Sequence, residues 1–212
     1  MAHVLAFGDS NTYGTCPITD PVLRRRYAPH LRWPGVSLDI LGAEWTLVEE
    51  GLPGRTTAHP DPEMGPHMDG RVGLAIALQS HGPIDILTLM LGTNDLKFHF
   101  GQTAEQIASN ASFLLDMAKS EEMQVRHNGF RILLICPPPI LECGEIAGKF
   151  AGGRAKSLLL ADAFAAVAHA YDVAFLNAGD VIESSATDGV HLEQDMHQRL
   201  GETVAQRLRS MV

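Results

Sequence analysis

Three polar side chains, one near the start of the chain and two near residue 190, have the types needed for nucleophilic catalysis. Ser10 ends a Gly-Asp-Ser segment that follows the apolar run of residues 4–7, and Asp188 precedes His191 by three residues. A serine hydroxyl attacks a carbonyl carbon when an imidazole takes its proton and a carboxylate orients that imidazole. We therefore expect Ser10 as nucleophile, His191 as general base and Asp188 as its partner in the cleavage of an ester.

Acyl transfer also needs hydrogen-bond donors where an oxygen becomes negative, each worth about 3–4 kcal/mol of barrier. The sequence offers three such donors near predicted strand ends: the backbone N–H of Ser10, the backbone N–H of Gly54 and the side-chain amide of Asn94. Asp9 and Asp95 have carboxylates that can hold the surrounding loops through backbone N–H groups. We expect the three donors to form an oxyanion hole.

Short apolar runs alternate with helix-length segments along the chain, a pattern typical of an α/β fold with a mostly parallel sheet. The expected strands cover residues 3–9, 45–50, 84–91, 130–136 and 173–177. The expected helices cover about 34–41, 72–79, 103–120, 151–171 and 192 or 193 to 211. The third and fourth strands are almost unbroken hydrophobic stretches, which places them inside the sheet. Parallel strands bring their carboxyl ends to one edge, so the candidate residues meet there.

Composition favours one globular α/β domain over residues 1–212. The chain has 25 acidic and 16 basic residues and a net charge of -9, which disfavours nucleic acid and anionic membranes as partners. Three cysteines leave one unpaired in any disulfide scheme, as in a reduced compartment. No export signal or apolar run long enough to span a membrane is visible, so we expect a cytoplasmic protein.

The order of these blocks resembles the SGNH hydrolases, also called the GDSL esterase/lipase family. Ser10, Gly54, Asn94 and His191 match its four named residues, and Asp188 matches the acid of its closing Asp-x-x-His. The resemblance implies a three-layer, doubly wound, flavodoxin-like parallel sheet of five strands in the order 2-1-3-4-5, with no metal or cofactor.

Residues 49–57, 90–97 and 137–139 make the likeness closest to the bacterial arylesterase/acyltransferase branch. This implies hydrolysis of short-chain aryl or alkyl esters through an acyl-enzyme, and assembly into a homo-oligomer. Acyl transfer to alcohols is left open, because it depends on how apolar the entrance is. The chain departs from the family at Asn11, where GDSL has Leu, and at Glu49, where an Asn is common.

Substrate contacts are expected from residues near the predicted strand ends and in the first long loop. They are Asp9, Asn11, Tyr13, Trp33 and Thr93. Tyr13 and Trp33, with Thr15 and Cys16, would line the entrance. Residues 15–33 and 53–70 are the two long irregular stretches, and either could form walls of the site or contacts between subunits.

Two other functions share some of these features. A carbohydrate esterase that removes acetyl groups would use the same machinery, since Tyr13 or Trp33 could stack on a sugar as well as a phenol. A non-catalytic module could bind a flavin or phosphate at the switch point of the sheet, but such a module needs no Ser, His and Asp in register. The α/β-hydrolase elbow is excluded because residue 12 is Thr and Asp188 lies so close to His191.

Several other segments carry reactive or charged side chains without a matching motif. Residues 59–69 hold potential metal ligands but lack the spacing of a known site, so no metal is expected. Residues 144–150 lack the spacing and the Ser or Thr of a phosphate loop. His197 is expected on the exposed side of the last helix. Arg24, Arg25 and Arg26 are expected to be solvated or to bridge subunits.

Overall fold

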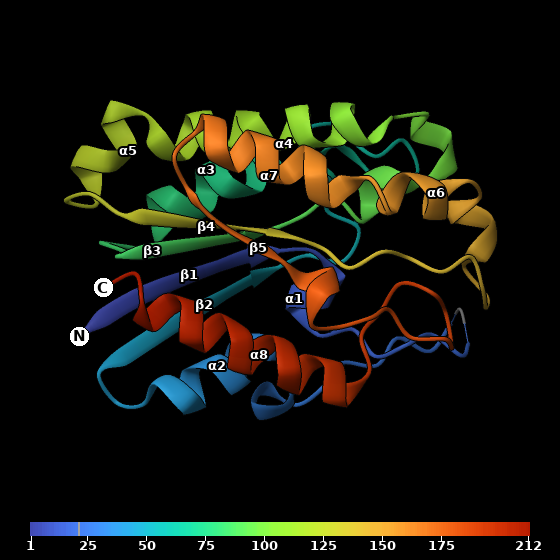
Figure 1. Ribbon diagram of the computed structural model, residues 1–212, viewed down its shortest axis with the longest axis horizontal. Coiled ribbons are helices and arrows are strands. Elements are labelled where there is room, and N and C mark those ends of the chain that lie inside the picture. The colour runs from blue at the N-terminus through green and yellow to red at the C-terminus, as the bar shows by residue number, and fades with distance from the viewer. Residues whose placement is uncertain (21) are drawn as a thin grey trace.

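The computed structural model describes residues 1–20 and 22–212 and contains a five-stranded parallel sheet (Figure 1). Its strands are β1 (Ala2–Gly8), β2 (Trp45–Gly51), β3 (Ile86–Met90), β4 (Arg131–Cys136) and β5 (Ala174–Asn177). They lie in the order β2-β1-β3-β4-β5, and all four neighbouring pairs are parallel. The expected topology and the inner positions of β3 and β4 are confirmed.

Helices cover both faces of the sheet (Figure 1). The helices α2 (Trp33–Leu41) and α8 (Gln194–Arg209) pack on one face. The helices α3 (Gly70–Ser80), α4 (Ala104–Lys119) and α7 (Leu160–Ala170) pack on the other. Three shorter helices are α1 (Ser10–Tyr13), α5 (Glu121–Arg126) and α6 (Gly153–Ser157). No helix in the described ranges combines the length and apolarity needed to cross a membrane.

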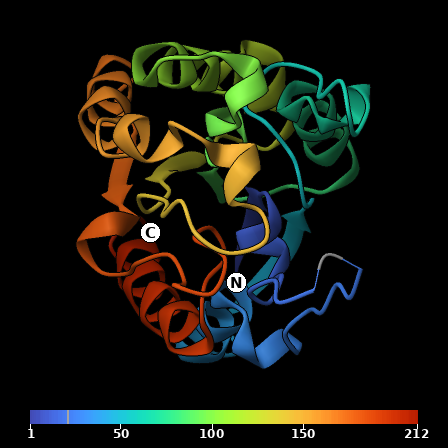
Figure 2. The same ribbon diagram turned by 90° about the vertical axis from the view of Figure 1, so that its right-hand side faces the viewer.

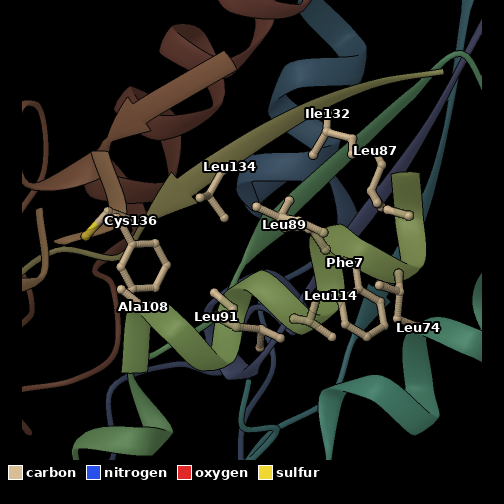
Figure 3. Packing of buried hydrophobic residues seen from close by; sticks show 14 of the residues in the cluster. Phe7, Leu74, Leu87, Leu89, Leu91, Ala108, Leu114, Ile132, Leu134 and Cys136 are labelled. Carbon is tan, nitrogen blue, oxygen red and sulfur yellow. The ribbon is translucent and has the colours of Figure 1, made fainter. Parts of the chain in front are cut away.

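Alternation along the inner strands builds two cores, because successive side chains of a strand point to opposite faces. Phe7 and Leu89 join the core beneath α3, α4 and α7 (Figure 3). Ala6 and Met90, their chain neighbours, belong to the core beneath α2 and α8. Strands buried on both faces need apolar residues at every position, which explains the unbroken hydrophobic stretches in the sequence.

The five expected helices are present, but one of them is interrupted, and the short helices α1 and α5 were not expected. The long helix expected over residues 151–171 is interrupted at Leu158 and Leu159, which are exposed between α6 and α7. At the end of α6, Ser157 Oγ accepts a hydrogen bond from the Ile140 N–H at 3.1 Å. The helix α7 then buries Leu160, Phe164 and Ala168 on the face that it turns to the core. The helix α5 begins at Glu121 and is capped by Ser120, whose hydroxyl accepts from Met123 N at 3.4 Å.

The long loop expected over residues 15–33 leaves the carboxyl edge of the sheet after α1. Residue 21 of that loop lies outside the described residues. The loop is tied at its base, since Ile18 N donates to Asp188 Oδ2 at 2.7 Å. An isolated antiparallel bridge joins Thr15 to Arg26, and Cys16 N donates to Arg25 O at 3.0 Å. These contacts pair residues 15 and 16 with residues 25 and 26 and attach the loop to Asp188.

Candidate active site

Ser10 lies where β1 ends, at the carboxyl edge of the sheet, which Figure 2 views face on. It is the first residue of the short helix α1, and Asp9 caps that helix by accepting from Asn11 N at 3.0 Å. Gly8 is required at the turn, because a Cβ there would lie 2.0 Å from Thr12 Oγ1 and 2.9 Å from the Met90 carbonyl oxygen. The tight turn directs the Ser10 hydroxyl into the cavity at this edge.

The structure brings together the three residues predicted to do the chemistry. Ser10 Oγ lies 3.1 Å from His191 Nε2, and His191 Nδ1 lies 2.6 Å from Asp188 Oδ2. All three side chains are almost completely buried. With the carboxylate on Nδ1, the neutral ring carries its proton there and presents Nε2 as an acceptor for the serine hydroxyl. This is the tautomer that a general base for Ser10 requires.

Asp188 is held as a carboxylate by several donors. Burial opposes its ionisation, but the bond from His191 and backbone N–H groups outweigh burial and lower the pKa of Asp188 below its usual 3.8. The backbone donors are Ile18, at 2.7 Å to Oδ2, and Val190 and His191, each at 2.9 Å to Oδ1. Because these bonds come from both sides of the carboxylate, its orientation toward the imidazole is fixed.

A cavity of about 300 Å³ opens beside Ser10 and His191. Gly54 and Asn94 line it, as expected for donors to an oxyanion. Its other walls come from apolar, aromatic and basic residues: Tyr13, Thr15, Ile18, Arg24, Arg25, Arg26, Pro53, Met64, Lys97, Ile146, Lys149, Phe150 and Val190. A cavity of this volume accommodates a small ester next to the hydroxyl.

The three expected oxyanion donors all reach this cavity. The backbone N–H groups of Ser10 and Gly54 have no acceptor among residues 1–20 and 22–212, so both are free to bind an oxygen. Gly54 has φ 95, and a Cβ there would lie 2.5 Å from Met64 Cε, so the position favours glycine. The Asn94 amide donates to Arg55 O at 3.0 Å and has a longer contact of 3.4 Å with Asp9 Oδ2. The longer contact is weak enough to exchange for a substrate oxygen.

Arg55 joins the ends of two strands beneath the Gly54 loop. Its guanidinium donates to the carbonyl of Gly8 at 2.8 Å and also to that of Glu50, and it stacks 4.0 Å above the Phe7 ring. Burial lowers the pKa of Arg55 to about 10, which still leaves it charged at neutral pH. The sequence analysis assigned no role to Arg55. Its position directly after Gly54 could have indicated that a charged side chain attaches this loop to the strand ends.

Asp95 connects the loop of Gly54 to the loop of Asn94. Its carboxylate accepts from Thr57 N at 3.1 Å, from the Thr57 hydroxyl, and from His59 Nε2 at 3.0 Å. The carboxylate is fully buried, so these donors replace its water shell. Asp95 therefore links the loop of Gly54 to the loop of Asn94, as expected for a carboxylate that supports these loops.

Three residues expected to contact substrate lie behind the cavity wall instead. Asp9, Asn11 and Thr93 are buried and do not line the cavity. Burial raises the pKa of Asp9 to about 6, against the lowering effect of the bond from Asn11. Asn11 Nδ2 donates to Val190 O at 3.1 Å, and Asn11 Oδ1 accepts from Leu192 N at 3.2 Å. Asn11 therefore bonds both chain neighbours of His191 and positions the imidazole.

Two aromatic side chains occupy places that the sequence analysis did not predict. Trp33 was expected at the entrance, but it is fully buried in the core between the sheet and α2 and α8, because it begins α2 with its side chain on the inner face. His197 was expected to be exposed, but it is also fully buried. Its Nδ1 accepts from Trp33 N at 3.3 Å, and burial lowers the pKa of His197 to about 3. Of the expected entrance residues, Tyr13 and Thr15 line the cavity and Cys16 does not.

The loop of residues 59–69, which holds potential metal ligands, is bound to the rest of the site by ion pairs. Asp61 Oδ2 lies 2.7 Å from Lys97 Nζ, and Asp69 pairs with Arg71 at 2.6 Å. Within residues 1–20 and 22–212 there is no group of three or more His, Cys, Asp or Glu side chains placed to hold a metal ion. Asp61 and Asp69 therefore form ion pairs with basic side chains.

Known proteins share this fold and sequence pattern. The model of the GDSL-like lipase/acylhydrolase family matches residues 6–199. The chain is similar to an aryl esterase from M. smegmatis (35% identity) and to Est24, a carbohydrate acetylesterase from Sinorhizobium meliloti (34%); each has a TM-score of 0.95 with 100% of both chains covered. A lipase/acylhydrolase from Enterococcus faecalis, at 18% identity over 99% of this chain and 96% of its own and a TM-score of 0.65, shows the fold alone. Curated protein sequences give no match.

Fold, site and similarity together define the class of this protein, which is a carboxylic ester hydrolase. The five-stranded sheet in the order 2-1-3-4-5 is the fold of SGNH hydrolases. Within this class, the chain belongs to the GDSL-like lipase/acylhydrolase family. The resemblance seen in the sequence is thereby confirmed.

Asn11 gives a test of how the imidazole is positioned. Asn11→Ala removes both bonds to the neighbours of His191, so we expect kcat/KM for an ester to fall about ten- to hundredfold through misplacement of the base. Steady-state kinetics measures this loss. Asn110→Ala is a matched control. Asn110 lies on α4, and its substitution removes one amide hydrogen bond to Gln102, so kcat/KM should be unchanged. Equal activity of the two variants would show that Asn11 does not position His191.

The ion pair between His59 and Asp95 should make the free energy of unfolding of the protein depend on pH. Burial alone would lower the pKa of His59, but the bond to Asp95 outweighs it and raises the pKa above 6.5. A raised pKa stabilises the folded state fully below pH 6.5, and this contribution is lost as pH rises through the folded-state value. The unfolding free energy of the wild type minus that of His59→Gln should therefore be larger at about pH 5.5 than at about pH 8.5. Urea denaturation at both pH values measures it, and a constant difference would contradict the assignment.

Proposed function

We propose that this protein hydrolyses short-chain acyl esters, such as aryl or alkyl acetates, through an acyl-enzyme on Ser10. The observation that supports this most directly is the unbroken line of contacts from Ser10 Oγ to His191 and on to Asp188, at 3.1 Å and 2.6 Å, beside the cavity. A non-catalytic binding module has no need for such an arrangement.

The reaction follows from the positions of the groups. His191 Nε2 takes the proton of Ser10 Oγ as that oxygen bonds to the carbonyl carbon, and Asp188 stabilises the imidazolium. The carbonyl oxygen becomes negative and binds the N–H groups of Ser10 and Gly54 and the Asn94 amide. His191 then protonates the departing alcohol as the ester bond breaks. Water, deprotonated by His191, attacks the acyl-enzyme and releases the carboxylic acid and the free serine.

The cavity supports a small ester with a hydrophobic part. Its volume of about 300 Å³ limits the combined size of acyl and alcohol groups, and its walls include Ile18, Ile146 and Phe150. Tyr13 provides an aromatic side chain close to Ser10 for a phenol ring. No carboxylate lines the cavity in the described parts of the chain, whereas sugar hydroxyls need acceptors for their protons. These features favour aryl and alkyl esters over acetylated sugars.

The first test asks whether Ser10 carries the acyl group. Purified protein mixed with p-nitrophenyl acetate should release a burst of phenolate stoichiometric with enzyme, because acylation of Ser10 precedes water attack. Ser10→Ala should abolish the burst and reduce kcat at least about 10⁴-fold. Ser112→Ala, a serine on α4 whose hydroxyl bonds a backbone carbonyl, is the control and should behave as the wild type. Undiminished turnover by Ser10→Ala would refute the proposal.

A carbohydrate acetylesterase is the second candidate, because Est24 is as similar to this chain as the aryl esterase. Comparison of kcat/KM for phenyl acetate with that for acetylated glucose and acetylated xylan separates the two. We expect phenyl acetate to be preferred, since the cavity has apolar walls and no carboxylate acceptor among the described residues. A preference for either acetylated sugar would reverse the choice.

Three further proposals accompany this function. A cytoplasmic location is favoured by the odd number of cysteines. The family resemblance implies the other two, which are assembly into a homo-oligomer with contacts from the loop of residues 15–33 and acyl transfer to alcohols in competition with water. Exposed Val22 and Leu23 in that loop support the homo-oligomer. Light scattering would measure the number of subunits, and product analysis in the presence of butanol would measure transfer.

A further inference from the structure

The walls of the cavity carry charge of one sign. The chain as a whole has 25 acidic and 16 basic residues. In the described part of the chain, however, five basic side chains line the cavity and no acidic one does: Arg24, Arg25, Arg26, Lys97 and Lys149. Because acidic residues outnumber basic ones in the chain, a random distribution of charged residues would place carboxylates in the cavity wall. A wall with basic side chains alone therefore indicates that the cavity binds a negatively charged molecule.

Three of the five cations are already neutralised by carboxylates that lie outside the cavity lining. The pairs are Lys97 with Asp61 at 2.7 Å, Arg26 with Glu49 at 3.2 Å and Lys149 with Glu63 at 3.1 Å. Arg26 is also fixed in place, since its guanidinium lies 3.9 Å above the Tyr13 ring and donates to the Tyr13 carbonyl at 2.7 Å. Because Lys97, Arg26 and Lys149 are paired in this way, their positive charges are largely neutralised and attract an anionic ligand only weakly.

Arg24 and Arg25 differ from the other three. Neither has a carboxylate within 4.0 Å among residues 1–20 and 22–212, and both residues are exposed and line the cavity. Asp20, the acid of the same loop, is occupied by the backbone N–H groups of residues 22 and 23. Two guanidinium groups are therefore free to bind an anion.

The backbone of this arginine pair is anchored to the catalytic residues. Cys16 N bonds the Arg25 carbonyl at 3.0 Å, and two residues further along, Ile18 N bonds the Asp188 carboxylate at 2.7 Å. The loop that carries the free cations is thus connected to the acid of the triad. An anion bound by Arg24 or Arg25 would belong to a substrate whose ester group reaches Ser10 in the same cavity.

We infer that the preferred substrates are esters that carry an anionic group, such as a carboxylate, at the end remote from the scissile bond. Guanidinium groups bind carboxylates through charge-assisted, often bidentate hydrogen bonds. The inference rests on the proposed function, because it names the substrate class of the same site. The anion can sit on the acyl part or on the alcohol part of the ester, and the test distinguishes the two.

The test uses two pairs of esters that differ in charge and match in shape. One pair places the charge on the alcohol part: 4-acetoxybenzoate and 4-acetoxybenzamide. The other places it on the acyl part: the 4-nitrophenyl monoesters of adipic acid and of adipic acid monoamide. For each pair we measure the ratio of kcat/KM for the charged ester to that for the neutral ester, in the wild type and in variants, so that intrinsic reactivity cancels.

The double variant Arg24→Gln with Arg25→Gln should lower this ratio about three- to tenfold for at least one pair at low salt. The ratio in the wild type should also fall as sodium chloride is raised to about 0.5 M, because salt screens exposed charges. Arg199→Gln, which removes an exposed arginine on α8 away from the cavity, is the control and should leave both ratios unchanged. The pair that responds identifies the part of the ester that carries the anion.

Ratios that are the same in the wild type and the double variant for both pairs, and that do not respond to salt, would overturn the inference. Such a result leaves the proposed function intact as long as hydrolysis of the neutral esters depends on Ser10. Activity that persists in Ser10→Ala would instead remove the proposed function, and the inference with it. The two failures are therefore distinguishable from the same set of proteins.

Discussion

The hydrogen bond between Ser10 Oγ and His191 Nε2 joins residues 181 positions apart, and the rest of the site depends on it. A bond of this kind requires that the hydroxyl and the imidazole are both held within a fraction of an ångström. The sheet positions the hydroxyl, because β1 is an inner strand and places Ser10 at the middle of the carboxyl edge. Asn11 positions the imidazole by bonding the backbone on both sides of His191.

The residues predicted to form the oxyanion hole depend on buried charges in a similar way. Ser10, Gly54 and Asn94 lie on three loops that follow β1, β2 and β3. Arg55 bonds carbonyls at the ends of β1 and β2, and Asp95 bonds the backbone and side chain of Thr57 across the gap to β3. Each buried charge has several partners, which offsets the cost of removing it from water. Ionic groups that take no part in the reaction therefore set the distance between groups that do.

The sequence predicted the strands and the meeting of Ser10, Asp188 and His191, because these depend on local hydrophobic pattern and on the shared edge of parallel strands. The order of the strands was implied only by the resemblance to a known family. The sequence did not predict which side of a helix faces the core when the helix is short or flanked by loops. Trp33, at the start of α2, was misplaced for that reason. His197 lies on the longer helix α8 in line with Gly201 and Ala205, and such small residues gave no sign that this row of the helix is also buried. The positioning role of Asn11 was not visible either, because its partners are backbone groups 179 and 181 residues away.

The position of the imidazole along the chain has a consequence for synthesis on the ribosome. All five strands lie within residues 2–177, so a nascent chain contains the whole sheet before residue 191 has been added. Such an intermediate contains the Ser10 hydroxyl but not its imidazole partner, and the bonds from Asn11 to residues 190 and 192 have not formed. The pairing of hydroxyl and imidazole is therefore withheld from partly made chains, and it forms only when the segment before α8 docks against α1.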